Sequence, residues 1–372
     1  ADGGGANRIA DTLIDTFGPK HVQWAMLIAA FIVGIALFFE VGLVLLIPLV
    51  FTIAKRAKVS PLKLGLPMVT ALSVTHGFLP PHPGPVVIAK ELKANIGHVL
   101  LYGIIIAIPV TLIAGPIFNK FAQKLIPSAY TREGDISALG SQKEFKASEM
   151  PSFGLSILTA VLPVILMLLS TVVQLVTGHE TAKNLFEQII YFIGTAGTAM
   201  LISVIFAIFS MGLHRGRKMD DIMKSVTNAI YPIGMMILII GGGGTFKQVL
   251  IDGGVGYTIA KLFEGSTMSP ILLAWIVAAV LRIALGSATV AAISTTGIVL
   301  PLLQHSDANV ALVVLAIGAG SVILSHVNDA GFWMFKEYFG LTVKETFLTW
   351  SLLETIISVS GIIFILFISL FV

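Results

Sequence analysis

The sequence predicts an all-α polytopic membrane protein with an inverted repeat that contains two re-entrant hairpins and two broken transmembrane helices. The first observation is composition: 56% of the 372 residues are hydrophobic and 12% are charged, whereas soluble domains average about 25% charged residues. The second is that several apolar segments reach the roughly 20 residues that a helix needs to cross a bilayer. The third is that prolines and polar residues interrupt such segments in both halves of the chain.

Short strings at an offset of 250 residues relate the two halves. Asp2-Gly3-Gly4 recurs as Asp252-Gly253-Gly254, and Thr75-His76 corresponds to Ser325-His326. Three apolar segments precede the Asp-Gly-Gly string in the second half, and none precedes it in the first. We therefore expect that about three helices of the first repeat, roughly 75–100 residues, are absent from the front of this chain.

This repeat divides the chain into a first repeat at 1–125, a cytoplasmic linker at 126–152 and a second repeat at 153–372. The elements expected in chain order are a hairpin at 22–54, a broken helix at 64–90, helices at 98–124, 153–178, 189–213 and 226–250, a hairpin at 270–304, a broken helix at 310–335 and a helix at 346–372. A hairpin returns to its own side, so each complete half crosses the membrane an odd number of times. The halves are therefore expected to be inverted.

Both predicted hairpins are too long for one crossing and too short for two. Each has small or polar residues near its middle, Glu40-Val41-Gly42 in the first and Gly286-Ser287-Ala288-Thr289 in the second. Non-helical backbone at membrane depth survives only where protein or a water-filled cavity satisfies its polar groups. The hairpin tips are thus expected at a cavity. The alternative is one long tilted helix with a glycine kink.

Different residue types interrupt the two segments that follow the predicted hairpins. The first holds Pro80, Pro81 and Pro83, and proline removes a backbone donor and clashes with the preceding helical turn. The second places Asn328 and Asp329 in mid-span. Unwound helix ends present free N–H and C=O groups that suit anions and cations, respectively. Paired interruptions of this kind indicate a binding site between the halves.

Basic residues gather in alternate connections: around Lys55 to Lys63, in the segment 119–152, and at Arg215 to Lys218. The positive-inside rule places these connections in the cytoplasm. The first hairpin then opens to the cytoplasm and the second to the outside. No basic face interleaved with aromatic residues accompanies these loops, so a nucleic-acid partner is not expected.

Motifs of enzymes and cofactor sites are missing from the sequence. It has no His-Glu-x-x-His helix, no Gly-x-Ser-x-Gly turn and no phosphate-binding loop. The absence of cysteine excludes disulfides and thiolate metal sites. The glycine run at 241–244 closes an apolar helix, where it favours tight packing or a hinge over a nucleotide site. We therefore expect neither an enzyme nor a bound cofactor or metal.

Four polar-rich strings resemble the gluconate permease family of proton-coupled bacterial symporters. They are SVTHGFLPPHPGP at Ser73–Pro85, IIGGGGTFKQVL at Ile239–Leu250, LRIALGSATVAAI at Leu281–Ile293 and SHVNDAGFWMFKEYFG at Ser325–Gly340. The resemblance implies uptake of gluconate or a similar aldonate with protons across the bacterial inner membrane. Membership of the wider ion transporter superfamily implies an elevator-type movement and a possible homodimer. The helices expected to be absent from the front of this chain correspond to the front helices of that family.

A hydroxylated carboxylate needs a positive group for its anion and several hydroxyl or amide partners. The residues expected to bind it are Ser73, Thr75, His76, Gly77, Arg282, Gly286, Ser287, Thr289, Ser325, His326 and Asn328. A membrane Ser or Thr can instead bond the carbonyl one turn back, and an intramembrane His can be structural. We interpret His82, within the proline cluster, as structural.

Glu40 and Asp329 are the predicted proton carriers, because a membrane carboxylate is costly and marks function. The alternative for either is a fixed ion pair with Arg282 or Lys247, and Glu354 in the last helix is a weaker candidate. A cation/proton antiporter or ion channel of the same architecture, with Asp329 and Glu40 as its ion path, is the alternative function.

Overall fold

The computed structural model describes residues 3–18, 21–132, 134, 146, 149–177, 181–254, 268–303 and 306–372, and all regular structure in these ranges is helical. Most of the predicted linker, the final residues of the predicted elements 153–178 and 270–304, and the side chain of Lys247 lie outside the described part. The stretches that are long and apolar enough to cross a membrane include Pro61–Glu91, Ile96–Leu125, Phe153–Thr177, Ala196–Arg215 and Val343–Ile368. The protein is thus a polytopic, all-helical membrane protein.

The first part of the chain contains α1 (Gly5–Phe17), α2 (Val22–Ala36), α3 (Phe39–Ala57), α4 (Pro61–Phe78), α5 (Pro83–Glu91), α6 (Ile96–Leu112) and α7 (Phe118–Leu125). Prolines occupy the first position of α4 and α5, where the missing N–H would have no intrahelical partner. Asn95 caps α6 by accepting hydrogen bonds from the N–H groups of Gly97 and His98. A π-helical turn at Ile113–Ile117 joins α6 to α7.

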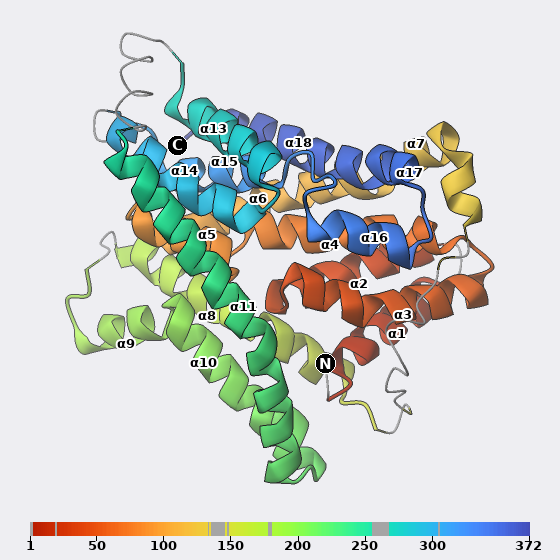
Figure 1. Cartoon of the computed structure of the whole chain (residues 1–372). Helices are drawn as coiled ribbons and strands as arrows, with labels where there is room; N and C mark the ends of the chain where they lie inside the picture. Colours follow the sequence, from red (N-terminus) through yellow and green to blue (C-terminus); the bar gives the residue numbers. More distant parts are fainter. Residues whose placement is uncertain are drawn as a thin grey trace.

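The remainder contains α8 (Phe153–Thr177), α9 (Leu185–Ile193), α10 (Ala196–Ala207), α11 (Met219–Asp252), α13 (Pro270–Leu285), α14 (Ala288–Leu303), α15 (Val310–Val322), α16 (Ala330–Tyr338), α17 (Val343–Thr346) and α18 (Leu352–Ile368). The helix expected at 189–213 is interrupted at Gly194 and Thr195, and Gly194 packs so closely on α8 that a Cβ would lie 2.2 Å from Ser170. The helix expected at 226–250 is longer and runs along the outside of the bundle against α14 (Figure 1).

Each segment predicted as a hairpin consists of two helices and not of one kinked helix. Leu37 and Phe38, both extended, separate α2 from α3. Gly286, with a left-handed φ of 73°, and Ser287 separate α13 from α14, and these two helices pack on each other. The α2–α3 pair packs on α4, and the α13–α14 pair packs on α15. The two pairs therefore occupy similar places beside the two interrupted segments.

Each of the two segments expected to be broken contains two helices with a non-helical connection between them. Residues 79–82 separate α4 from α5, and residues 323–329 separate α15 from α16. The helices α2, α3, α4 and α5 begin 247–249 residues before α13, α14, α15 and α16, respectively. The interrupted segments also touch, because a Cβ on Gly318 of α15 would lie 2.3 Å from the Gly77 carbonyl oxygen of α4. Glycine is required at Gly318 for this approach.

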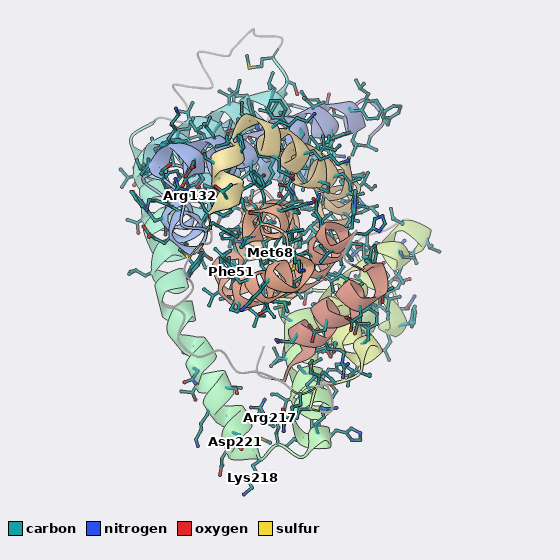
Figure 2. The ribbon with its side chains drawn as sticks, turned by 90° about the vertical axis from the view of Figure 1, so that its right-hand side faces the viewer. Phe51, Met68, Arg132, Arg217, Lys218 and Asp221 are labelled. Carbon is teal, nitrogen blue, oxygen red and sulfur yellow. The ribbon has the colours of Figure 1, made fainter. Side chains whose placement is uncertain are left out.

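The core lies where α4 and α15 meet, whereas the outer helices keep apolar side chains on their surface. Figure 2 shows Met68 of α4 in the middle of the bundle, and Met68 is fully buried. Ile108 of α6, Leu201 of α10 and Ile363 of α18 are more than half exposed, as expected for side chains that face lipid. The polar start of α11, with Arg217, Lys218 and Asp221 nearby, projects from one end of the molecule (Figure 2).

Candidate functional site

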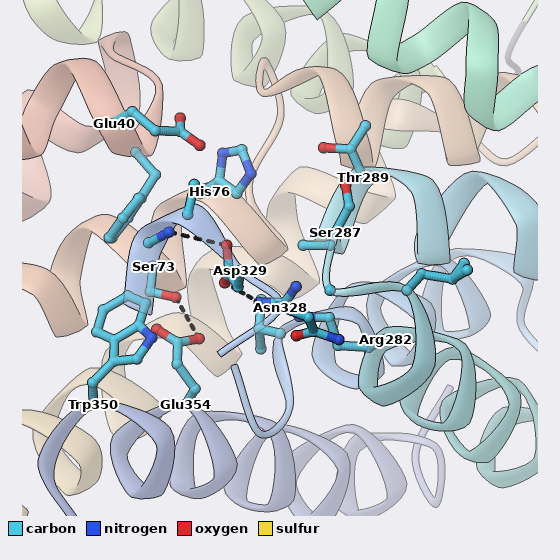
Figure 3. Close-up of a pocket in the computed structure, with 17 residues that line it drawn as sticks. Glu40, Ser73, His76, Arg282, Ser287, Thr289, Asn328, Asp329, Trp350 and Glu354 are labelled. Carbon is cyan, nitrogen blue, oxygen red and sulfur yellow. Dashed lines mark hydrogen bonds and ion pairs between the residues drawn. The ribbon is translucent and has the colours of Figure 1, made fainter. Parts of the chain in front are cut away.

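A cavity of about 310 Å³ lies where the connection between α13 and α14, the start of α3, the C-terminal part of α4 and the break before α16 converge (Figure 3). This volume is at the lower end of the roughly 300–1,000 Å³ typical of small-molecule sites. Its lining includes nine of the residues that the sequence predicts for the site: Glu40, Ser73, His76, Arg282, Gly286, Ser287, Thr289, Asn328 and Asp329. Residues from distant parts of the chain are thus brought to one cavity.

Arg282, which is buried, and Asp329, which is partly buried, form an ion pair at this cavity. Arg282 is 4% exposed, and its Nη2 donates a hydrogen bond to Oδ2 of Asp329. The Ser325 hydroxyl donates to the same oxygen, and the Gly331 N–H donates to Oδ1 at 3.0 Å. Asp329 is therefore also the N-cap of α16. The sequence left open whether Asp329 forms an ion pair with Arg282. In this conformation it does.

Several buried polar atoms around the cavity have no hydrogen-bond partner among the described residues. They are Nε and Nη1 of Arg282, Nδ1 of His76 and Oε1 of Glu354. Leaving a buried donor or acceptor unsatisfied costs about 1–3 kcal/mol, and more for a charged group. The cavity thus combines spare guanidinium donors with carboxyl and imidazole groups, which suits a ligand that carries both an anion and hydroxyls.

The start of α14 adds donors to the same wall. Ser287, Ala288 and Thr289 line the cavity, and α14 begins at Ala288, so the positive end of its dipole faces the site. The Ser287 hydroxyl accepts from the Val290 N–H at 3.3 Å. The amide nitrogen of Asn328 donates to the Ile283 carbonyl at 3.0 Å, which ties the broken segment to the end of α13.

The other predicted site residues lie outside the lining of this cavity. Thr75 is buried, donates to the Leu72 carbonyl at 3.0 Å and packs on Gly34. Gly77 packs on α15, as described above. His326 contacts the Ile283 carbonyl at 3.1 Å. The physical reason is helical periodicity: residues three apart, such as Ser73 and His76, share a face of α4 that Thr75 does not.

Ser325 and His82 have supporting positions next to the cavity. Ser325 is 1% exposed and accepts from Nε1 of Trp350 at 2.7 Å while donating to Asp329. His82 is 4% exposed and contacts the Gly34 carbonyl through Nε2 at 2.7 Å, and its ring packs edge-on against His76. His82 therefore holds the proline-rich break against α2, as expected of a structural residue.

The lining also includes Glu354, which the sequence indicated as a weaker proton candidate, and Trp350 and Phe39, which the sequence did not single out. Glu354 is 2% exposed and accepts a hydrogen bond from Ser73 at 2.8 Å. A carboxylate within an apolar span was a usable signal for Glu354. Trp350 and Phe39 gave no such signal, because aromatic residues in apolar helices are common.

Comparisons with known proteins identify the family of this chain. The chain matches the family model described as GntP family permease over residues 1–371. Over 375 aligned positions it is 62% identical to the gluconate permease of Bacillus subtilis (strain 168), covering 100% of this chain and 83% of that relative. It is 52% identical to the high-affinity gluconate transporter of Escherichia coli (strain K12), covering 98% and 81%, respectively.

A relative named for a different substrate matches almost as well. The Gnt-II system L-idonate transporter of Escherichia coli (strain K12) is 51% identical, covering 98% of this chain and 81% of that relative. A match over nearly the whole chain, together with identities above 50%, establishes common ancestry. This chain belongs to the GntP family of permeases, a family of membrane transporters and not of enzymes.

Proposed function

We propose that the protein imports gluconate or a similar aldonate together with protons across the bacterial inner membrane. The observation that carries the proposal is the buried guanidinium of Arg282, whose Nε and Nη1 have no partner among the described residues in a cavity lined by hydroxyl and amide groups. Arginine recognises carboxylates through paired, charge-assisted hydrogen bonds. Gluconate and L-idonate, for which the relatives are named, are hydroxylated carboxylates that fit this chemistry.

In this proposal the substrate carboxylate binds Arg282 and the start of α14, and its hydroxyls reach the polar groups on the opposite wall. Ser73, Ser287, Thr289 and Asn328 supply hydroxyl and amide groups at the lining. His76 adds a ring nitrogen that can donate or accept a hydrogen bond. The coupled proton passes through the acidic residues of the cavity, which include the predicted carriers Glu40 and Asp329.

We further propose that the two halves are inverted repeats that give alternating access to the cavity. The near-constant spacing between the starts of α2–α5 and α13–α16 supports this arrangement, as does the contact between α4 and α15. From the family resemblance we also propose an elevator-type movement and a homodimer. A cation/proton antiporter or channel is less well supported, because Arg282 in the cavity repels cations and pairs with Asp329, one of the two acids assigned to such a path.

Transport in reconstituted vesicles tests the proposal. With an acidic exterior, labelled gluconate is expected to accumulate above its external concentration, and a protonophore is expected to abolish the accumulation. Vesicles without protein provide the baseline. Uptake that is indifferent to the pH gradient contradicts proton coupling, and sodium flux in the absence of gluconate favours the antiporter or channel.

A matched pair of substitutions on α4 tests which of its faces contacts substrate. Ser73→Ala is expected to raise the KM for gluconate about two- to tenfold, because one hydrogen bond contributes roughly 0.5–1.5 kcal/mol. Thr75→Val removes a hydroxyl that bonds within the helix, so it is expected to leave the KM within about twofold. Initial uptake rates measured over a range of gluconate concentrations give the KM of each variant. An equal rise in KM in both variants contradicts the assignment.

A further inference from the structure

Glu354 is a buried carboxyl group in the cavity wall without an ionic partner in the described part of the chain. It lies on α18, is 2% exposed and faces Ser73 across the cavity edge (Figure 3). The Ser73 hydroxyl donates to Oε2 at 2.8 Å, whereas Oε1 has no hydrogen-bond partner among the described residues. A hydroxyl alone compensates little of the desolvation of an ionised carboxylate.

The three acids that line the cavity differ in how their charge is compensated. Asp329 is held by Arg282, by Ser325 and by the Gly331 N–H. Glu40 is exposed, so water can solvate its charge. Only Glu354, of these three, is buried without a cation or a backbone donor among the described residues. Burial therefore makes ionisation more costly for Glu354 than for the other two acids.

The charged and titratable groups that share the cavity with Glu354 come from four segments of the chain. Arg282 on α13 and Asp329 before α16 neutralise each other, His76 lies on the same face of α4 as Ser73, and Glu40 lies at the start of α3. A substrate anion that binds Arg282 adds a negative charge beside Arg282 and Asp329, which already neutralise each other. The added charge disfavours ionisation of Glu354 and so strengthens its hold on the proton.

Resting on the proposed function, we infer that Glu354 carries the proton that is co-transported with the substrate anion. Linkage is reciprocal: if the anion strengthens proton binding at Glu354, the proton strengthens anion binding at Arg282 by the same factor. Substrate and proton therefore load together from the outside. When the anion leaves toward the cytoplasm, the O–H bond of Glu354 breaks and the proton passes to water, which resets the empty site.

Two transport assays on the full chain in proteoliposomes separate coupling from binding. The first measures exchange of labelled for unlabelled gluconate without a gradient, and the second measures accumulation driven by a pH gradient with a pH-sensitive dye inside. Glu354→Gln keeps the size and an amide that can bond Ser73, but it cannot release a proton. We expect accumulation to fall at least tenfold and gluconate-linked acidification to vanish, while exchange persists and loses its pH dependence.

Two further variants provide controls. Glu354→Asp retains an ionisable group and is expected to keep proton-linked accumulation. Glu337→Gln removes an exposed carboxylate on α16 that pairs with Lys336 at the surface, and it is expected to behave as the unsubstituted protein. If Glu354→Gln still accumulates gluconate against its gradient, the inference is overturned while the proposed function stands. An unsubstituted protein that does not exchange gluconate overturns both.

A binding measurement on the unsubstituted protein remains decisive even if Glu354→Gln fails to fold. Gluconate is added to the purified full chain in weakly buffered detergent solution, from mildly acidic to mildly alkaline pH, while the dye reports protons. We expect net proton uptake on gluconate binding at alkaline pH and none at acidic pH. Binding without proton uptake at any pH overturns the inference.

Discussion

Gluconate uptake is expected to fall about 100-fold or more when Arg282 is replaced by glutamine. Arg282 supplies the only guanidinium among the described residues that line the cavity, and its Nε and Nη1 have no partner among them. Each hydrogen bond to a charged group contributes about 1.5–3 kcal/mol, so losing two to the substrate carboxylate removes measurable affinity. The same change leaves the partly buried Asp329, whose side chain is 19% exposed, without its cation, so the free energy of unfolding is also expected to fall. Uptake and thermal unfolding in detergent measure the two effects.

The double variant Arg282→Gln with Asp329→Asn separates these effects. It replaces the ion pair by a neutral pair of similar size, so most of the lost stability is expected to return. Transport is not expected to return, because the guanidinium that binds the substrate is still missing. Recovery of uptake in the double variant would mean that Arg282 serves only to neutralise Asp329.

The second large effect is expected at Gly286, between α13 and α14. Its φ is 73°, and a Cβ there would lie 2.3 Å from the Asn328 carbonyl oxygen. Gly286→Ala therefore combines a left-handed strain of about 1–2 kcal/mol with an overpacking cost of about 1–3 kcal/mol. The connection has to move away from the broken segment, which displaces Ser287 and Arg282, so we expect gluconate uptake to fall at least tenfold.

Gly216→Ala is the matched control for Gly286→Ala. Gly216 has a φ of 76°, and a Cβ at this position would meet no described atom within 4 Å. The variant experiences the same backbone strain without the collision, so only the strain cost is expected in thermal unfolding, with uptake unchanged. If both variants lose the same stability and activity, contact between the α13–α14 connection and the broken segment is not what positions the site.

Local chemistry explains how much of the cavity could be predicted from the sequence. The cluster of prolines at 80, 81 and 83 favours an end to α4, and the polar run at Asn328 and Asp329 marks the second break. Of the nine predicted residues that line the cavity, Gly286, Ser287, Asn328 and Asp329 lie in non-helical connections, where polar backbone groups at membrane depth need protein or water. Thr75 was included for its hydroxyl near the proline-rich break and for its match to Ser325, and neither observation says which face of a helix is turned inward.

The sequence alone determined the membrane class, the helical composition and the family resemblance, because bilayer thickness and local residue chemistry act along the chain. Only the tertiary structure decided which groups pair. The contacts of Ser73 with Glu354, 281 residues apart, and of Arg282 with Asp329 depend on how distant helices pack. That packing satisfies Asp329 but leaves Glu354 without a cation among the described residues, a difference in charge compensation that no local pattern encodes.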